Sequence, residues 1–289
     1  MYLLDAQGNV INKIKKGDAR KQKEWRFPLK YHYHTRILRE GLYTEESMKH
    51  PAKMNPLWAQ RIIQEYSKLN EVILDPMAGV GTTGIEASRL GRKAVMIDIE
   101  RKWVNEMKKN IKLLEKNGQK IGEVMVMRGD ATKLNKTMFP RKFKPDVVIF
   151  SPPYGHEGVS GDTSLRGGEK YDEYGERDRN IGMKKGKAYD EAMLKVYASI
   201  NKVLPKNKLM IVNIKDRTEN RKRIRTGERL KNIAPLLGFK FVESRRIYAP
   251  PSGFRNIAEK KHGIPKIRSE RILVFKKVGE PKIKLSDNA

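Results

Sequence analysis

The residues Ser151-Pro152-Pro153-Tyr154 combine a hydroxyl group, two prolines and an aromatic ring, directly after the apolar run Val147 to Phe150. The run predicts a buried strand. The prolines end it, because proline has no N–H to donate and favours an extended residue before it. In an open α/β sheet, ligands bind just outside the carboxyl ends of the strands. A stiff corner with a hydrogen-bond acceptor and a stacking face suits a flat base that carries an exocyclic amine. A plain Pro-Pro turn is an equally consistent interpretation of these four residues alone.

A second motif lies upstream, where the predicted strand Glu71 to Asp75 runs into Pro-Met-Ala-Gly-Val-Gly-Thr-Thr at residues 76–83. A strand, a glycine-containing loop and a helix form the first unit of a nucleotide-binding fold. Gly79 and Gly81 allow the backbone to approach a ligand closely. The motif predicts a cofactor loop, although a Gly-x-Gly sequence by itself is a weak signal.

Two further acids strengthen this interpretation. Asp98 lies near the end of a second predicted strand, Lys93 to Ile99, and Asp130 follows a third, Glu123 to Arg128. In dinucleotide-binding folds, an acid about 20 residues beyond the first strand binds ribose hydroxyls. One such acid is often only a helix cap. Three acids in phase at the same sheet edge favour a ligand that carries a nucleoside.

The elements that must position these residues fit one large α/β domain with an N-terminal extension. We expect a basic, aromatic extension at residues 1–47, beginning with a small hairpin, and the main domain at residues 48–289. Apolar periodicity predicts helices after Pro56, from Arg101 to Asn117 and from Asp190 to Leu204. A stripe of Trp58, Ile62, Tyr66 and Leu69 is assigned to the core. The remaining predicted strands are Leu209 to Ile214, Phe239 to Tyr248 and Ile272 to Lys276.

The segment from Gly155 to Lys187 is polar and rich in glycine. Long irregular segments of compact domains are usually lids, binding loops or disordered. We therefore predict a mobile flap that covers the corner after Phe150 and becomes ordered on substrate.

Net charge is the most informative feature of the composition, because 62 Lys and Arg oppose only 34 Asp and Glu in the 289 residues. Self-repulsion at a net charge of +28 destabilises a folded chain unless a polyanion neutralises it. A thermophilic, ion-paired surface also carries many charges but does not require this imbalance. The excess is polarised, since residues 201–289 hold 24 Lys and Arg against 8 Asp and Glu. This distribution favours a nucleic acid partner.

Two segments are candidates for that contact. Between residues 15 and 39, aromatic residues alternate with cations, as at Trp25 and Arg26, and bases stack on such rings while cations follow the phosphates. A packed extension that covers a sheet edge is an equally good interpretation. Between residues 217 and 231, a solvated helix face is the alternative, but the scarcity of acids favours phosphate contact. The predicted contact residues there are Arg221, Arg223, Arg225 and Arg229.

Several classes of protein and site are disfavoured. The chain has no cysteine, which excludes disulfides, cysteine-based metal sites and thiolate nucleophiles. Its five histidines are scattered singly, so no metal site is predicted. No apolar run is long enough for a membrane span and the first 16 residues lack the apolar region of a signal peptide. A cytoplasmic protein is the resulting expectation, with no oligomeric state implied.

Taken together, the glycine motif from Asp75 to Thr83 and the tetrapeptide at Ser151 to Tyr154 resemble the S-adenosylmethionine-dependent amino-methyltransferases. The resemblance covers roughly residues 48–215 and implies a Rossmann-like class I methyltransferase fold. Such a fold has a seven-stranded mixed sheet in which the last strand is reversed. The implied cofactor is S-adenosylmethionine.

The resemblance also implies roles for individual residues. Asp98 would bind the ribose hydroxyls and Asp130 the adenine amine. Ser151 and the Pro152 carbonyl would engage the amine of the target, Pro153 would stiffen the corner, and Tyr154 would stack on the target ring. The amino-acid part of the cofactor would lie against His50, Pro51, Lys53, Asp75, Pro76, Met77, Ala78, Gly79, Gly81, Thr82 and Thr83.

The tetrapeptide bears on the substrate. Its Ser form is typical of cytosine-N4 enzymes of this family, whereas an Asp form is typical of adenine-N6 enzymes. In many Ser-type DNA enzymes the tetrapeptide precedes the glycine loop, but here the glycine loop comes first. The chain also lacks an obvious target-recognition domain. These departures favour structured RNA as the substrate and suggest the archaeal ribosomal-RNA cytosine-N4 branch of the family.

Other functions are compatible with the sequence. Within the same family they are cytosine-N4 or adenine-N6 modification of DNA. Enzymes that methylate glutamine are related, but they have Asn at the first position of the tetrapeptide and no need of a strongly basic chain. Outside the family, the alternatives are a basic RNA-binding factor that no longer catalyses and an NAD-dependent oxidoreductase.

Overall fold

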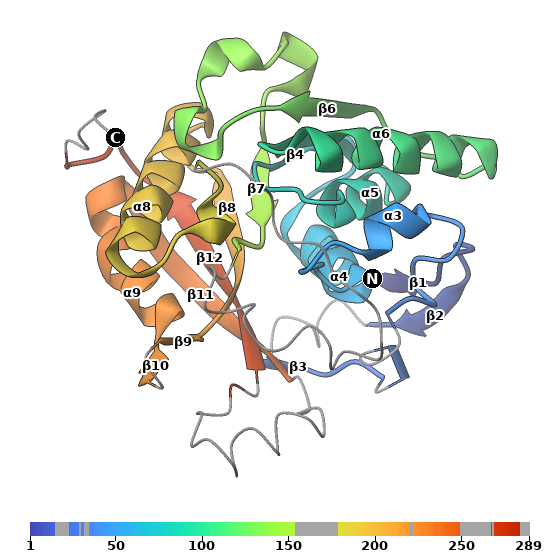
Figure 1. Cartoon of the computed structure of the whole chain (residues 1–289), viewed down its shortest axis with the longest axis horizontal. Coiled ribbons are helices and arrows are strands. Elements are labelled where there is room, and N and C mark those ends of the chain that lie inside the picture. The colour runs from blue at the N-terminus through green and yellow to red at the C-terminus, as the bar shows by residue number, and fades with distance from the viewer. Residues whose placement is uncertain are drawn as a thin grey trace.

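The computed structural model describes residues 1–14, 23–28, 30–31, 35–153, 179–219, 222–248, 267 and 269–283. Its central feature is an eight-stranded mixed sheet with the order β3-β11-β12-β8-β7-β4-β5-β6 (Figure 1). Strand β12 is antiparallel to both of its neighbours, as the expected fold requires. The strands are β3 (Glu24–Trp25), β4 (Val72–Asp75), β5 (Lys93–Asp98), β6 (Val124–Arg128), β7 (Val147–Phe150), β8 (Leu209–Lys215), β11 (Phe239–Tyr248) and β12 (Ser269–Lys277).

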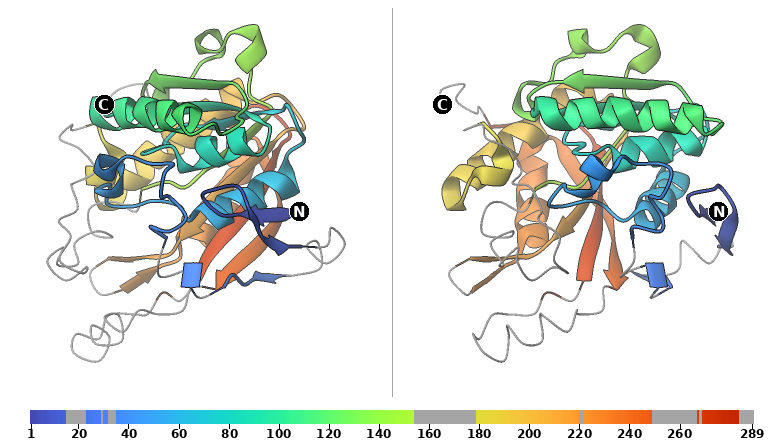
Figure 2. Two further views of the ribbon diagram at one scale, coloured as in Figure 1. Left: turned by 90° about the vertical axis from the view of Figure 1, so that its right-hand side faces the viewer. Right: turned by 45° about the vertical axis from the view of Figure 1, so that its right-hand side comes forward.

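The seven-stranded class I methyltransferase sheet predicted from the sequence is confirmed, with β3 as an additional edge strand. Helices cover both faces of the sheet (Figure 2). The alternation of strand side chains accounts for the two layers. On β4, Leu74 packs on the side of α8 (Gly186–Val203) and α9 (Thr226–Ile233). Ile73 points to the opposite side, towards α4 (Pro56–Tyr66) and α5 (Thr82–Arg89). Helix α6 (Arg101–Lys116) packs on β5 and β6.

Local sequence signals set the helix ends. Asn55 caps α4 by accepting a hydrogen bond from the Leu57 backbone N–H at 2.9 Å, and Pro56 occupies the first turn. Because α4 ends at Tyr66, the prediction that Leu69 belongs to the core is wrong, and Leu69 is 66% exposed. Helix α8 begins four residues before the predicted Asp190. Within the described ranges, no helix combines the length and the hydropathy that a membrane crossing requires.

The predicted flap falls largely outside the described residues, together with Tyr154. Its final part is described and is packed. Ile181–Met183 forms a 3₁₀ turn in which Ile181 is buried, and residues 186–187 belong to α8.

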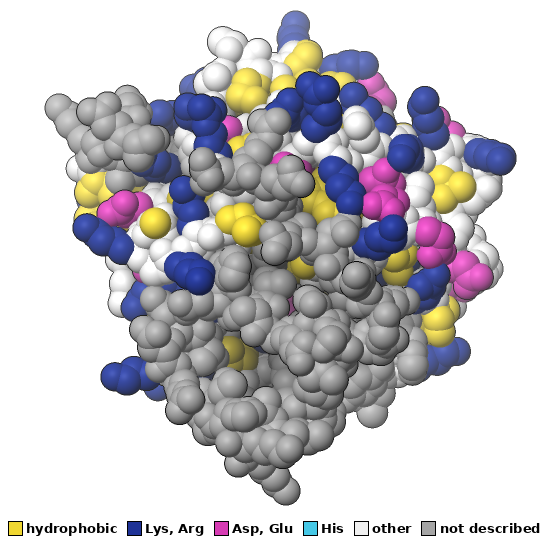
Figure 3. Space-filling model, in the orientation of Figure 1, with side chains coloured by type: hydrophobic (Ala, Val, Ile, Leu, Met, Phe, Trp, Pro, Cys, Tyr) yellow, Lys and Arg dark blue, Asp and Glu magenta, His cyan; other side chains and the backbone are white. Residues whose placement is uncertain are grey.

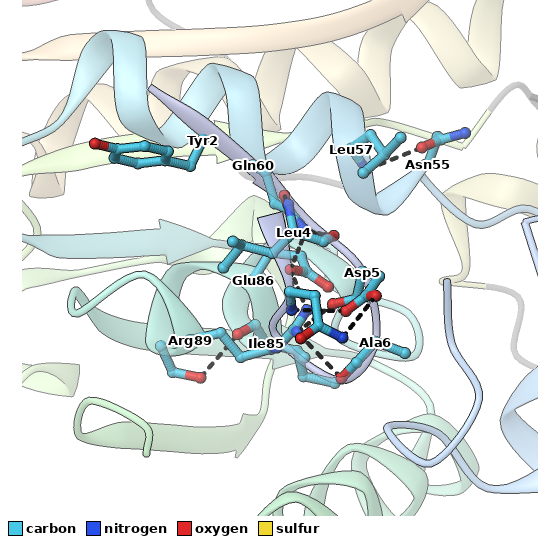
Figure 4. Close-up of polar contacts among 12 residues, drawn as sticks. Tyr2, Leu4, Asp5, Ala6, Asn55, Leu57, Gln60, Ile85, Glu86 and Arg89 are labelled. Carbon is cyan, nitrogen blue, oxygen red and sulfur yellow. Dashed lines mark hydrogen bonds and ion pairs between the residues drawn. The ribbon is translucent and has the colours of Figure 1, made fainter. Parts of the chain in front are cut away.

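The predicted N-terminal hairpin is confirmed as β1 (Tyr2–Leu4) and β2 (Val10–Lys13), which pair in antiparallel orientation. On the edge of β1 that does not pair with β2, two glutamines one helical turn apart on α4 form hydrogen bonds to its backbone. The Gln60 amide accepts from the Leu4 N–H at 2.7 Å and donates to the Leu4 carbonyl at 2.9 Å, and Gln64 does the same for Tyr2. Gln60 also donates to Glu86, which pairs with Arg89 (Figure 4).

The N-terminal extension covers a sheet edge through Trp25, because β3 pairs in parallel with β11. The Trp25 ring is fully buried, with the Arg61 guanidinium 4.2 Å from its centroid. The prediction that this ring stacks on a base is therefore wrong. Arg26 is exposed, pairs with Glu24 at 2.9 Å and lies over the Tyr248 ring.

Trp25→Ala should lower the free energy of unfolding by about 3 to 5 kcal/mol, because it leaves a cavity and removes the partner of the buried Arg61. Chemical denaturation of the purified protein measures this loss. Phe27→Ala is the comparison, since Phe27 is only partly buried beside the same cluster and should cost less. Equal losses in the two variants would contradict the importance of the Trp25 edge contact.

Candidate functional site

The three acids and the proline corner meet at the carboxyl edge of the sheet. In the pairing register, Asp75 lies opposite Met96 on β5, so Asp98 is two residues further along. Asp98 lies opposite Arg128 on β6, and Asp130 is again two residues further along. On the other side of β4, Leu74 lies opposite Val148, so Ser151 follows the adjacent strand end. The chain reverses its direction of winding between β4 and β7, where ligands bind in such folds.

The loop after β4 has the backbone of a ligand cradle. Gly79 and Gly81 have φ values of 54° and 88°, a conformation that favours glycine. A Cβ atom on Gly79 would lie 3.0 Å from His50 Nε2, and one on Gly81 would lie 2.8 Å from Met96 Sδ. No side chain fits at either position without displacing a neighbour. The backbone of this loop therefore packs closely against its neighbours and leads directly into the start of α5.

Asp98 joins this loop to the next helix. One carboxylate oxygen accepts a hydrogen bond from the Gly79 N–H at 2.9 Å, and the other accepts from the Glu100 N–H at 2.9 Å. Glu100 is the N-cap residue of α6 and accepts from the Asn180 side chain at 3.0 Å. Each oxygen of Asp98 retains acceptor capacity for a ligand hydroxyl.

The segment predicted to lie over the cofactor does reach the glycine loop. His50 is buried between Gly79 and Trp103, with its ring 4.5 Å from the Trp103 ring. Lys53 donates to the carbonyls of Met48 and His50 at 2.6 and 2.5 Å. We therefore assign Lys53 to the shape of this turn, which places His50 against the loop.

The two central carboxyl groups have unusual acidities. Burial raises the pKa of Asp75 to about 7, although the Thr83 hydroxyl and the Met77 N–H oppose this shift. Burial also raises the pKa of Asp98 to about 7 against the backbone hydrogen bonds it accepts. His50 is shifted in the opposite sense, and burial lowers its pKa to about 3. The imidazole is therefore neutral when the carboxyl groups titrate.

A pH dependence of cofactor affinity follows. A cationic ligand that donates hydroxyl groups favours the ionised carboxylates and lowers their pKa, so binding releases protons. The affinity for S-adenosylmethionine should rise from about pH 6 to about pH 7 and level off above, by at most tenfold per pH unit for each group. Calorimetry in buffers of different ionisation enthalpy measures both the affinity and the protons released. An affinity that does not change with pH would contradict the assignment of these acids.

The proline corner is anchored by a side chain of helix α8. The Tyr189 hydroxyl on α8 donates a hydrogen bond of 2.5 Å to the Pro153 carbonyl. The Tyr189 ring is buried beneath the Arg217 guanidinium, 4.6 Å from its centroid, and Asp190 pairs with Arg217 at 2.9 Å. Within the described part of the chain, neither the Ser151 hydroxyl nor the Pro152 carbonyl makes a hydrogen bond, and Ser151 is partly exposed. With respect to the described residues, the corner thus keeps one hydroxyl and one carbonyl as acceptors without a partner.

The remaining predicted site residues are distributed as follows. Asp130 accepts from the Thr132 N–H and hydroxyl at 2.9 and 2.6 Å, and thus also caps a short 3₁₀ turn. Pro51, Pro76, Ala78, Thr82 and Thr83 are buried around the loop, and Met77 is partly buried. Arg221 lies outside the described residues. Arg223, Arg225 and Arg229 are exposed.

Three residues of the site were not predicted from the sequence: Glu100, Asn180 and Tyr189. Glu100 lies two residues beyond Asp98, and this closeness in the sequence could have indicated that it belongs to the site. Asn180 was hidden in the segment interpreted as a flap. Tyr189 precedes the predicted start of α8 and contacts a carbonyl 36 residues away, which no local pattern reveals.

Comparisons with known families match the two halves of this site. Residues 5–109, which include the glycine loop and Asp98, match a family described as "DNA methylase". Residues 59–165, which also include the proline corner, match a family described as "Conserved hypothetical protein 95".

The chain is also similar to individual proteins. It is 44% identical over 63 residues to the Type II methyltransferase M2.LlaDCHI of Lactococcus lactis subsp. cremoris, and 40% identical over 63 residues to M2.DpnII of Streptococcus pneumoniae. Each match covers 22% of this chain and about a quarter of the relative, 23% and 24% respectively. Among solved structures, TrmN from Thermus thermophilus superposes with a TM-score of 0.49 and 16% identity, over 81% of this chain and 51% of that chain.

Proposed function

We propose that the chain is an S-adenosylmethionine-dependent amino-methyltransferase that transfers a methyl group to the exocyclic N4 amine of cytosine in structured RNA, ribosomal RNA in particular; its similarity to DNA methylases supports the first part of this proposal. The observation that carries the proposal is the anchored proline corner, where the Ser151 hydroxyl and the Pro152 carbonyl have no hydrogen-bond partner among the described residues, beside a glycine loop tied to the partly buried Asp98.

The residues around the glycine loop fit the cofactor. The left-handed glycines let the loop pack closely against His50 and Met96, where a side chain would not fit. Asp98 holds the loop and can accept from ribose hydroxyls, while Asp75 and the loop would hold the amino-acid part and Asp130 the adenine amine. When bound, S-adenosylmethionine supplies an electrophilic methyl group on a sulfonium. The chain supplies orientation and the carboxyl groups of Asp75 and Asp98 beside the loop.

The corner would act on the target base. The N4 lone pair of cytosine is delocalised into the ring, which makes the amine a poor nucleophile. Acceptors at the Ser151 hydroxyl and the Pro152 carbonyl would hold its two N–H bonds and favour a tetrahedral nitrogen directed at the methyl donor. The prolines keep the acceptors fixed, and Tyr189 occupies the next carbonyl so that it does not compete. The base must leave its stack, or already be single-stranded, to enter.

The form of the tetrapeptide and the net charge support an RNA cytosine substrate. Ser at the first position favours cytosine N4 over adenine N6. A net charge of +28 suits binding by shape and backbone, as is usual for structured RNA. DNA modification is the second candidate, because the sequence relatives are Type II methyltransferases.

The proposal is tested by comparing cells that contain the gene with cells that lack it. RNA and DNA are digested separately and the nucleosides are identified by mass. We expect N4-methylcytidine to disappear from RNA when the gene is absent. Complementation with Ser151→Ala should not restore it, whereas Ser244→Ala on β11, at a serine that is partly exposed like Ser151, is a matched control that should restore it.

Each outcome is informative. Loss of a methylated deoxycytidine or deoxyadenosine from DNA would favour the second candidate. No change in either nucleic acid would contradict a methyltransferase function. Full complementation by Ser151→Ala would contradict the role of the corner.

A further inference from the structure

Helix α6 presents a row of cations that the sequence did not single out. Arg101, Lys108, Lys112 and Lys116, which we call the α6 stripe, are all exposed. At 3.6 residues per turn they fall within about 80° of one another around the helix axis, over a length of about 22 Å. The exposed acid beside the stripe is Glu115.

The cations of the α6 stripe have no acidic partner among the described residues. In the part of the chain that the structure describes, none of the four forms an ion pair, whereas their neighbour Lys109 pairs with Glu106 at 2.6 Å. Four like charges along one helix face repel one another. A polyanion would relieve this repulsion.

The basic segment singled out in the sequence is different. Asp190 on α8 pairs with Arg217 at 2.9 Å and with Arg229 at 2.8 Å. Arg223 pairs with Asp216 at 2.7 Å, and Lys231 with Glu228 at 3.2 Å. A phosphate would have to compete with these carboxylates. The α6 stripe therefore offers phosphates more uncompensated charge than this segment does.

The same edge of the sheet carries further cations. Residues 101–145 hold 13 Lys and Arg against 4 Asp and Glu. Lys133, Lys136, Arg141 and Lys144 are exposed in the segment that follows β6. Figure 3 shows Lys and Arg side chains along the upper edge of the molecule, where Figure 1 places α6 and the end of β6.

The α6 stripe begins at the candidate site. The helix starts immediately after Glu100, whose N–H donates to Asp98 at the cofactor edge of the sheet. From Arg101 the stripe leads away from that edge along the length of α6. A nucleic acid whose target base enters the site could therefore continue along this helix.

We propose that the α6 stripe binds the sugar-phosphate backbone of the nucleic acid substrate. The chemical identity of this partner rests on the proposed function. The stripe adds binding energy and positions the substrate, and it does not select the base.

The test compares two triple variants with the same change in net charge. One carries Lys108→Glu, Lys112→Glu and Lys116→Glu in the α6 stripe. The control carries Lys202→Glu, Lys206→Glu and Lys240→Glu, three exposed lysines on α8, the following loop and β11. Binding of a fluorescein-labelled RNA hairpin of mixed sequence is measured by anisotropy over a range of KCl concentrations, without cofactor. S-adenosylmethionine binding by both variants verifies that they are folded.

The slope of log K against log salt is negative, and each phosphate interaction that the substitutions remove should reduce its magnitude by about 0.9. We expect the slope of the stripe variant to fall by about 2 to 3 and its RNA binding to weaken at least about tenfold at fixed salt, with a slope change below about 1 in the control. Equal losses in both variants would mean that only total charge matters, and would overturn the proposal. Unchanged RNA binding by the stripe variant would also overturn it and leave an acidic protein as the partner of this face.

These outcomes are separate from those of the proposed function. If the wild-type chain transfers no methyl group but binds RNA through the stripe, the proposed activity fails and the surface assignment stands. If methyl transfer occurs and the stripe variant binds normally, only the surface assignment fails.

Discussion

Asp98→Ala should lower the affinity for S-adenosylmethionine by a factor of at least about 100, equivalent to about 2.8 kcal/mol. The variant removes the acceptor of the Gly79 and Glu100 N–H groups, so the glycine loop and the start of α6 lose their connection. It also removes the group that would accept the ribose hydroxyls. A hydrogen bond to a charged group contributes about 1.5 to 3 kcal/mol, so the loss of one ligand contact and of loop order accounts for the expected change.

The measurement is calorimetry with S-adenosylmethionine on the folded variant. Glu115→Ala is the control, because Glu115 is an exposed acid on the following helix and should leave the affinity unchanged. Asp98→Asn, which keeps one side-chain oxygen, should lie between the two. An unaltered affinity in Asp98→Ala would remove Asp98 from the cofactor site. Binding of NAD in place of S-adenosylmethionine would point to an oxidoreductase instead.

Tyr189→Phe should lower kcat by about 100-fold while the KM for S-adenosylmethionine stays within about twofold, because a misplacement of about 1 Å in an active site can cost a factor of 100. The substitution keeps the buried ring under Arg217 and removes only the hydroxyl that donates to the Pro153 carbonyl. The corner then loses its anchor, while the glycine loop, which follows the neighbouring strand β4, is unaffected. Tyr189 is thus a positioning residue for Ser151 and Pro152.

Tyr197→Phe is a matched control. Tyr197 is also a buried tyrosine of α8 and packs near Phe150, but among the described residues it makes no hydrogen bond to the corner. If the role of Tyr189 were purely structural, both variants should have a lower unfolding temperature. The loss of kcat at an unchanged KM, which we expect for Tyr189→Phe alone, should then be absent. A Tyr189→Phe enzyme with wild-type kcat would contradict the positioning role.

The site illustrates which features can be predicted from the sequence. Asp75, Asp98 and Asp130 were located correctly at one edge because each ends a short apolar strand, and parallel strands bring their carboxyl ends together. The glycine loop and the proline corner are likewise local, since backbone freedom and stiffness depend on the residue itself. Both ends of strand β11, Phe239 and Tyr248, were also predicted correctly from the local sequence.

Charge and aromatic residues were harder to interpret. Trp25 lies in a segment that resembles a base-stacking surface, yet β3 joins the sheet and buries its ring against Arg61. Arg217 and Arg229 form part of a conspicuous basic cluster, yet Asp190 on another helix neutralises both. The solvent exposure and the pairing of a side chain depend on elements that are distant in the sequence.

The sequence by itself therefore determined most of the strands of the sheet, the edge at which ligands bind and the residue types offered there, because these follow from local periodicity and backbone chemistry, whereas the arrangement of the strands was implied only by the family resemblance. Only the tertiary structure decided that Tyr189 anchors the corner, that Asp98 ties the loop to α6 and that the α6 stripe has no ion pair among the described residues. The physical reason is that hydrogen bonds, burial and ion pairs join residues from different elements, and their partners are fixed only when those elements pack.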